Sequence, residues 1–300
     1  MAVNDNREAV IALGFFDGVH RGHGKLIEMA KKRAEERSAI PAVLSFDVSP
    51  ESVIKGKNVP LISSTEARED AIHRFYDVEK VIFYHFDKRV MSMPWKEFID
   101  SLIAEFNAVH FVIGHDFNCG YMGQGTTDRI TEYCKSLGIG CDVIPKFTID
   151  DITVSSTYIR SLISVGDIER ANMFLGHPYT IVGEVSQGFK MGRKIGAPTI
   201  NIHCKPELLL PPFGVYATKV LVGDEVYIGV TNVGVRPTFG GDKTVSVETY
   251  ILDFEGDLYG KNVRVDFYTF LRPERKFESP EELKNMIDYN AKQTREYFGV

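Results

Sequence analysis

Two histidines three residues apart, His20 and His23, lie in the glycine-rich segment Gly14-Phe-Phe-Asp-Gly-Val-His-Arg-Gly-His23. The segment follows a short apolar run and precedes a pattern typical of an amphipathic helix. A turn between a strand and a helix presents free backbone amides and the positive end of the helix dipole, and both attract phosphate. Glycines at positions 14, 18 and 22 allow the backbone to approach such an anion closely. The segment therefore predicts a site for the phosphates of a nucleotide.

A second candidate segment is Val154-Ser-Ser-Thr-Tyr-Ile-Arg160, in which hydroxyl side chains precede an arginine. At the start of a helix, these groups could donate several hydrogen bonds to a polyphosphate and place a guanidinium against it. Taken alone, the segment is more often an N-cap serine followed by a surface arginine. Together with the histidine segment, it favours a phosphate site.

A third segment, residues 183–201, combines a glycine-rich basic loop with Pro198-Thr-Ile-Asn201. Thr199 and Asn201 occupy alternate positions of a strand, point the same way, and offer oxygen ligands suited to a nucleotide-bound Mg²⁺. A solvated basic turn is the alternative interpretation. Glu248 interrupts a run of strand-forming residues, a position at which most glutamates simply face water. The chain has neither a Walker phosphate-binding loop, nor Gly-x-Gly-x-x-Gly, nor a serine-nucleophile elbow.

The sequence pattern of the elements that must position these residues changes near residue 176. Before it, short apolar runs alternate with helical patterns, which predicts repeated βα units and a parallel sheet. We expect strands at 9–13, 40–46, 80–84 and 109–113, and helices at 25–37, 64–75, 94–105 and 127–137.

Beyond residue 176 the runs become β-branched and alternating, which predicts an antiparallel sheet or a small barrel. Gly223-Asp224, between two of these runs, predicts a hairpin turn. A final helix is indicated by Ser279 as N-cap, Pro280 at the first position and Glu282 completing a capping box. The sequence thus predicts an α/β domain at 1–175 and a β domain at 176–300. The strands expected in the second are 180–185, 215–222, 225–230, 245–253 and 263–270.

The composition favours a soluble chain that is long enough for two cores, with 300 residues, 44% hydrophobic and 25% charged. A formal charge of −6 gives no global attraction for nucleic acid or anionic lipid, so an anion site must be local. The four cysteines, at 119, 134, 141 and 204, form no Cys-x-x-Cys pair, which argues against a zinc site. We expect a cytoplasmic protein with small-molecule substrates, without a signal peptide or membrane span. Homo-oligomer formation stays open.

From about residue 9 to its end, the chain resembles the bacterial bifunctional riboflavin kinase/FMN adenylyltransferase family. Gly14 to His23 is similar to that family's form of the nucleotidyltransferase HxGH motif, and Ser155 to Arg160 to its second phosphate motif. Gly192-Arg-x-x-Gly-x-Pro-Thr-x-Asn201 and Glu248-Thr-Tyr250 are similar to the riboflavin kinase signatures. The resemblance implies a Rossmann-like nucleotidyltransferase domain with a parallel sheet. A small antiparallel β-barrel riboflavin kinase domain with a C-terminal helix would follow it.

The resemblance also implies two ATP-dependent reactions, from riboflavin to FMN and from FMN to FAD, with Mg²⁺ as cofactor. Glu248 matches the family's general base, the 188–194 loop matches its phosphate-covering flap, and His20 with His23 would stabilise phosphate charge. The metal would be held by Thr199 and Asn201. The implied ATP-binding residues are Gly14, Phe15, Asp17, Gly18, His20, His23, Ser155, Ser156, Thr157, Arg160, Gly188, Lys190, Gly192, Arg193, Thr199 and Asn201, and the implied flavin-binding residues are Asp116, Phe117, Asn118 and Arg272.

The first half departs from the family pattern at three positions. Ser49 stands in place of a histidine, and Asn118 and Thr153 stand in place of arginines. These departures favour an alternative in which the chain is a riboflavin kinase whose first domain has reduced or lost adenylyl transfer. A third hypothesis is a nucleotidyltransferase for another phosphorylated substrate with an unrelated β module. The complete Pro198-Thr-x-Asn201 motif and Glu248 count against it, and the kinase motifs depart only at Ala197 and Ile200.

Overall fold

The computed structural model describes residues 7–186, 198–237 and 243–300. The chain forms two compact units, each with its own core. The first comprises the residues up to Val59 together with Arg68–Ser155, and the second comprises Pro60–Ala67 together with Ser156–Val300. Among the described residues, no helix combines the length and the apolar character needed to cross a membrane.

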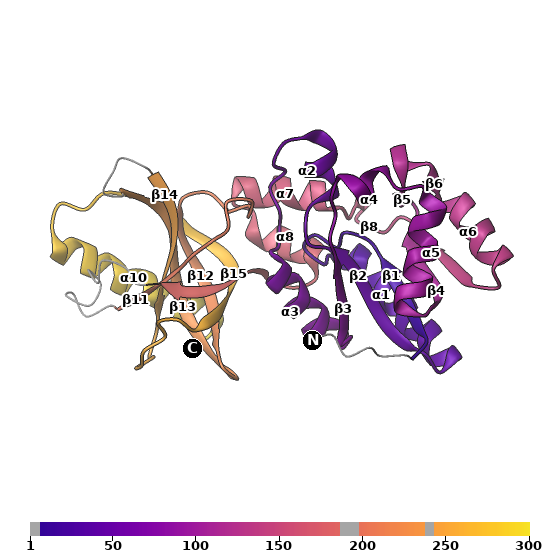
Figure 1. Ribbon diagram of the computed structural model, residues 1–300. Helices are drawn as coiled ribbons and strands as arrows, with labels where there is room; N and C mark the ends of the chain where they lie inside the picture. Colours follow the sequence, from indigo (N-terminus) through magenta and orange to yellow (C-terminus); the bar gives the residue numbers. More distant parts are fainter. Residues whose placement is uncertain (1–6, 187–197, 238–242) are drawn as a thin grey trace. The chain divides into compact units, whose positions relative to one another are not determined.

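The first unit is built on a five-stranded parallel sheet in the order β3-β2-β1-β4-β7. Figure 1 labels its strands β1 to β4. The four strands predicted from apolar runs are confirmed within a residue. The edge strand β7 was not predicted, because Gly140, Cys141 and Asp142 interrupt its apolar pattern. The strands are β1 Ala9–Leu13, β2 Ile40–Phe46, β3 Lys80–Tyr84, β4 Ala108–Gly114 and β7 Gly140–Ile144.

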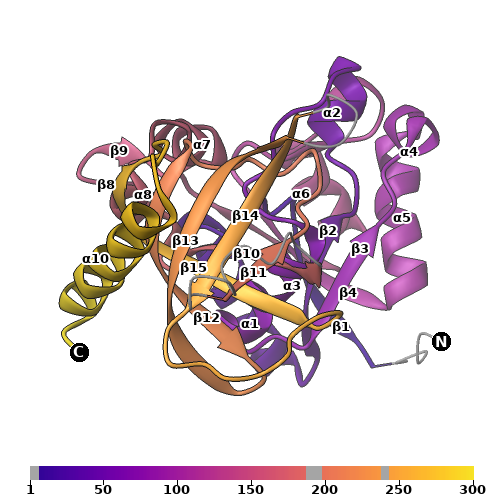
Figure 2. The same cartoon turned by 90° about the vertical axis from the view of Figure 1, so that its left-hand side faces the viewer.

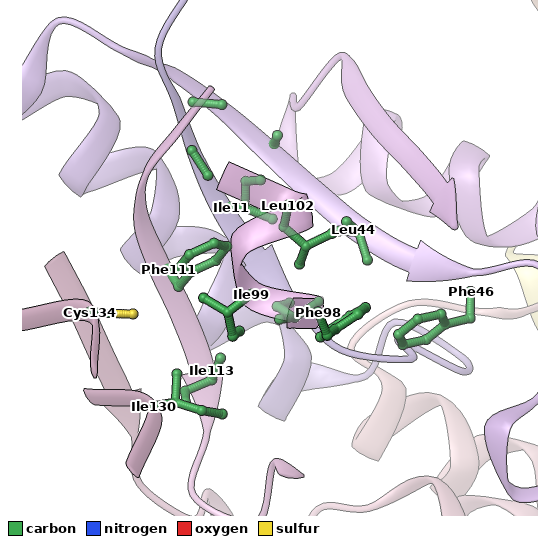
Figure 3. Packing of buried hydrophobic residues seen from close by; sticks show 14 of the residues in the cluster. Ile11, Leu44, Phe46, Phe98, Ile99, Leu102, Phe111, Ile113, Ile130 and Cys134 are labelled. Carbon is green, nitrogen blue, oxygen red and sulfur yellow. The ribbon is translucent and has the colours of Figure 1, made fainter. Parts of the chain in front are cut away.

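Helices cover both faces of this sheet, which is why β1 is buried at every position. On one face, Ile11, Leu44 and Phe111 pack against Phe98 and Leu102 (Figure 3). Each such side chain contributes about 1.5–3 kcal/mol when it is fully buried. The opposite face is covered by residues of α1 and α3. The helices of this part of the chain are α1 Arg21–Arg37, α2 Pro50–Lys55, α3 Thr65–Tyr76, α4 Lys88–Ser92, α5 Trp95–Phe106 and α6 Thr127–Ser136.

The shorter elements lie in the connections that follow strands β4 and β7. Two two-residue hairpins and one 3₁₀ turn make up this group. They are β5 Asn118–Cys119 paired with β6 Gly125–Thr126, η1 Tyr121–Gly123, and β8 Thr148–Ile149 paired with β9 Ile152–Thr153.

The second unit contains a closed antiparallel barrel in the order β10-β11-β14-β13-β12-β15, with β15 pairing back to β10 (Figure 2). Of the two arrangements left open by the sequence, the barrel is therefore confirmed. The expected hairpin is present, since Val222 pairs with Glu225 and Gly223 adopts φ 61°. The strands are β10 Tyr179–Ser186, β11 Thr199–Ile202, β12 Gly214–Val222, β13 Glu225–Pro237, β14 Lys243–Ile251 and β15 Asn262–Pro273.

The C-terminal helix α10, Pro280–Phe298, packs on the outside of the barrel, where Ala291 lies against Val215, Val230 and Leu252. Its N-cap is Ser279, whose Oγ accepts a hydrogen bond from the Glu282 N–H at 3.1 Å. The reciprocal bond differs from a simple capping box, because the Glu282 carboxylate accepts from the Glu278 N–H at 2.9 Å. Two further helices, α7 Ser156–Val165 and α8 Ile168–Leu175, pack on each other in the same unit.

Candidate active sites

The carboxyl ends of three neighbouring parallel strands carry most of the candidate residues of the first unit. The segment that starts at Gly14 follows β1, Ser49 follows β2, and Asp116 to Asn118 follow β4. Because β2, β1 and β4 are adjacent and parallel, these segments share one edge of the sheet. This is the edge at which open α/β sheets bind ligands.

The phosphate loop, defined here as residues 14–20, has an irregular backbone. Phe16, Gly18 and Val19 adopt φ values of 56°, 78° and 42°, and the Val19 N–H donates to the Phe16 carbonyl at 2.9 Å. A left-handed conformation costs a non-glycine residue about 1–3 kcal/mol, and such strain is found mostly at functional sites. Phe16, Asp17 and Val19 are all buried, so the surrounding core holds this conformation in place.

His20 is the N-cap of α1, and this role explains why the helix begins at Arg21 rather than at the predicted Lys25. Its Nδ1 accepts a hydrogen bond from the His23 N–H at 3.2 Å. In the neutral ring the proton therefore resides on Nε2. A side chain at position 22 would be crowded, because its Cβ would lie 3.2 Å from two atoms of the His20 ring.

The rings of His20 and His23 stack, with their centroids 3.6 Å apart and their planes inclined by 9°. The pKa of His23 lies well below its ordinary value, chiefly because the ring is buried and further because His20 and Arg68 are close. Nδ1 of His23 is buried, with no hydrogen-bond partner among the described residues. His23 is therefore neutral at pH 7 and can donate one hydrogen bond.

Arg68, on α3, is a residue of this site that the sequence analysis missed. Its side chain is buried, with 1% of its surface exposed, and its charge acts on His23. The available signal was its spacing, because Arg68 lies three and four residues before Ala71 and Ile72 on the buried stripe of α3. A charged residue on such a stripe almost always has a specific partner.

The second phosphate motif lies where the two units join along the chain. Ser155 ends the first unit, and Ser156, Thr157 and Arg160 lie in the first turns of α7, in the second. A hydroxyl-rich start to this helix matches the sequence expectation. The participation of these side chains in the phosphate site stays a prediction.

The candidate flavin residues after β4 form a turn in which the Phe117 N–H donates to the Gly114 carbonyl at 3.0 Å. Asp116 and Asn118 are exposed, whereas Phe117 packs against the core. The Asn118 amide donates to the Asp116 carbonyl at 3.3 Å, so it is folded onto its own turn. This exposed position is where the family's arginine would stand.

The two other departures have ordinary structural roles. Ser49 is the buried N-cap of α2, and its Oγ accepts from the Ser52 N–H at 3.2 Å. Thr153 lies in β9 and pairs with Thr148 of β8.

In the barrel, one row of directly opposed positions crosses five strands. Asn201 of β11 pairs with Glu248 of β14, Glu248 pairs with Asn232 of β13, and the row continues through Val215 to Arg272 of β15. Opposed residues of antiparallel strands share a face, so four polar side chains project from one side of the barrel wall. Sequence reasoning missed Asn232, because nothing in its spacing separates it from an ordinary strand asparagine.

Thr199 belongs to the same face as Asn201, two residues before it, as the sequence predicted. Asn201 is 5% exposed. Their hydroxyl and amide oxygens suit Mg²⁺, which takes few protein ligands when nucleotide phosphates supply the others. Within the described part of the chain, no cluster of three His, Cys, Asp or Glu side chains could hold a metal ion. Gly188, Lys190, Gly192 and Arg193 lie outside the described residues.

Arg272, at the end of the row, is tied to the C-terminal helix. Its Nε donates to Asn290 Oδ1 of α10 at 3.2 Å, and its Nη1 donates to the Pro273 carbonyl at 3.0 Å. Burial, together with the nearby Arg275, lowers the pKa of Arg272, but an arginine remains charged at any working pH. The guanidinium also lies 5.7 Å from the centre of the Phe277 ring. Arg272 is thus a fixed cation beside an aromatic ring.

A parallel α/β unit with a histidine pair at its ligand-binding edge, followed by a barrel with a glutamate in a polar row, defines a nucleotidyltransferase-like part and a kinase-like part. Comparisons with known proteins agree. A FAD synthetase family model matches residues 2–158, and a riboflavin kinase family model matches residues 175–298. The chain belongs to the bifunctional riboflavin kinase/FMN adenylyltransferase family.

Relatives of that name match nearly the whole chain. The protein of Bacillus subtilis is 38% identical, covering 98% of this chain and 94% of the relative. The protein of Listeria monocytogenes is 35% identical, covering 96% and 92%. A solved structure described as a macrolide-efflux protein from Streptococcus pneumoniae has the same fold, with a TM-score of 0.83 and 29% identity over 98% of this chain and 96% of that one.

Proposed function

We propose that the chain makes both flavin cofactors, phosphorylating riboflavin to FMN and then adenylylating FMN to FAD. The observation that carries the kinase assignment is the pairing of Asn201 with Glu248, which sets a carboxylate beside a candidate metal ligand. The names of the full-length relatives support both activities. We also propose that ATP is the donor in both reactions and that the protein acts in the cytoplasm on these small molecules.

In the kinase reaction, Glu248 would accept the proton of the ribityl 5′-hydroxyl as that oxygen attacks the γ-phosphorus of ATP. The bond from the γ-phosphorus to the bridging oxygen then breaks, and ADP leaves. Phosphoryl transfer depends mainly on positioning and charge neutralisation, with a base near the attacking hydroxyl. Thr199 and Asn201 would hold a Mg²⁺, which supplies neutralising charge at the phosphates. Lys190 and Arg193, in the loop that resembles the flap, would add positive charge.

In the adenylyl transfer, an FMN phosphate oxygen would attack the α-phosphorus of a second ATP, releasing pyrophosphate. No covalent intermediate on the protein is needed. His23 is neutral, so it would stabilise the phosphates by donating a hydrogen bond, and the α1 N-terminus beside it would supply the positive field. Ser155, Ser156, Thr157 and Arg160 would complete the donors, and Asp116, Phe117 and Asn118 would contact the flavin.

A second candidate is a riboflavin kinase with reduced or lost adenylyl transfer. The specific observation in its favour is Asn118, which stands in an exposed turn and donates to its own backbone at Asp116. A neutral amide there offers a phosphate-bearing flavin no ionic partner. A hydrogen bond to a charged group is worth about 1.5–3 kcal/mol, so its absence alone could raise the KM for FMN substantially.

The decisive experiment supplies the two substrates separately. Incubation with riboflavin and Mg²⁺–ATP should yield FMN, and incubation with FMN and Mg²⁺–ATP should yield FAD and pyrophosphate, both followed by chromatography. FMN without FAD supports the second candidate. If neither product forms across a range of conditions, the flavin assignment is wrong.

A further inference from the structure

The guanidinium of Arg68, a residue of α3, contacts the last two residues of β2. Its Nη1 donates to Ser45 Oγ at 2.7 Å and to the Phe46 carbonyl at 2.9 Å. The guanidinium carbon lies 4.4 Å from the centre of the Phe15 ring, and Phe15 belongs to the phosphate loop. A charged donor makes stronger hydrogen bonds than a neutral one, and a planar guanidinium also stacks well on an aromatic ring.

Ser45 continues this connection into the loop. Its hydroxyl donates to the Phe15 carbonyl at 2.7 Å while its oxygen accepts from Arg68. Arg68 therefore contacts the Phe15 ring directly, and Ser45 links it to the Phe15 carbonyl. Because the loop downstream of Phe15 carries left-handed residues at 16 and 19, an anchor at its start helps to fix an otherwise unfavourable backbone.

The charge of Arg68 also reaches the histidine pair. The groups that act electrostatically on His23 are His20, from its own turn, and Arg68, from α3, and Asp17 is a buried carboxyl in the same loop. Both His20 and Arg68 disfavour the protonated form of His23. A charge in a poorly hydrated interior acts over a longer distance than the same charge in water.

We propose that Arg68 is a positioning residue for adenylyl transfer, which anchors the phosphate loop through Ser45 and Phe15 and sets a buried positive charge close to His23. It would favour binding of the ATP triphosphate without touching it. The inference rests on the proposed function of the first unit.

The test uses Arg68→Met, which removes the charge and the hydrogen bonds, and Arg68→Lys, which keeps the charge alone. Arg74→Met is the matched control, because Arg74 lies on the same helix, 3.6 Å from Asp70 and 4.2 Å from the Phe75 ring centre. For FAD formation by the full chain, Arg68→Met should lower kcat/KM about a hundredfold, mainly through the KM for ATP. Arg68→Lys should recover part of this loss, and Arg74→Met should behave as wild type. Riboflavin phosphorylation by each variant reports that the second unit is intact.

A second readout does not depend on FAD formation. An NMR titration of the His23 imidazole should show its pKa rising in Arg68→Met, because a nearby positive charge has been removed, and rising less in Arg68→Lys. Calorimetry of the full chain should resolve two ATP sites, of which one weakens in parallel and the other does not. If wild type makes no FAD, the proposed function of the first unit fails, while the titration and the ATP affinity still test Arg68.

Two outcomes would overturn the proposal. One is a folded Arg68→Met variant with wild-type ATP affinity and an unchanged His23 titration. The other is an equal change in Arg74→Met. Should Arg68→Met fail to fold, Ser45→Ala and Arg68→Lys decide the matter, since wild-type ATP affinity in both would show that the loop needs neither anchor.

Discussion

His20 and His23 lie with their rings 3.6 Å apart and nearly parallel, so protonation of both would place two positive charges in contact. Burial, their electrostatic coupling and the charge of Arg68 together hold the pKa of His23 well below its ordinary value. The unfolded chain lacks these effects, and its His23 takes up a proton near pH 6.5. The pair is therefore linked to the pH dependence of folding.

The first prediction concerns this dependence. Well above pH 6.5 His23 is neutral in both states and does not affect how stability changes with pH. As the pH falls from there toward the pKa of folded His23, only the unfolded state binds the proton, and stability falls. By pH 5.5 the loss is at most about 1.4 kcal/mol. Denaturant titrations of wild type and His23→Gln at pH 7.5 and 5.5 should show a smaller pH effect in the variant, and equal effects would contradict the prediction.

The second prediction concerns Glu248. Glu248→Gln keeps the size of the side chain but removes the base, so riboflavin phosphorylation should fall about 10²–10⁴-fold in kcat with little change in ATP affinity. Glu248→Asp should keep partial activity. Glu225→Gln is the control, because Glu225 is a strand glutamate at an exposed position of β13. Steady-state FMN formation measures the effect, and a Glu248→Gln enzyme with near wild-type turnover would remove Glu248 as the base.

The third prediction concerns the departure at Asn118. Asn118 is exposed, so an arginine fits at this position without entering the core. Asn118→Arg should lower the KM for FMN in FAD formation about ten- to a hundredfold, because a hydrogen bond to a charged group contributes about 1.5–3 kcal/mol. Asn118→Gln, which lengthens the side chain without adding charge, is the control. An equal gain with glutamine would show that reach, rather than charge, limits the site.

The sequence predicted the architecture well, because burial on both faces of β1 and the alternation of buried and part-exposed residues along β14 follow directly from apolar patterning. It predicted Thr199 with Asn201, since alternate strand positions share a face. Asn232 was beyond it, whereas the position of Arg68 on the buried stripe of α3 signalled a partner without identifying it, because the partners depend on which strand or loop lies next to each residue. Strand register places Asn232 opposite Glu248, and tertiary packing places the Arg68 guanidinium over the Phe15 ring. The start of α1 was misplaced because histidine is an uncommon N-cap residue.

A fourth prediction comes from three buried threonines that link neighbouring barrel strands. The Thr218 hydroxyl donates to the Gly229 carbonyl at 2.9 Å, and Thr231 Oγ1 lies 2.8 Å from both Thr218 Oγ1 and Thr249 Oγ1. A hydroxyl has one hydrogen to donate. Since Thr218 uses its hydrogen on Gly229, Thr231 must donate to Thr218, and Thr249 must donate to Thr231.

Because the hydrogen bonds run in one direction, removing the hydroxyl should cost a different amount of stability at each of the three positions. Thr231→Val leaves the Thr249 hydroxyl buried without its acceptor, which costs about 1–3 kcal/mol. Thr249→Val removes the last donor and leaves no hydroxyl hydrogen in the chain unpaired, so it should cost clearly less. Thermal denaturation of the two variants at one pH measures the difference, with riboflavin phosphorylation as a check that the barrel is native. Equal stabilities, or a less stable Thr249→Val, would mean that the hydrogen bonds do not run from Thr249 through Thr231 to Thr218.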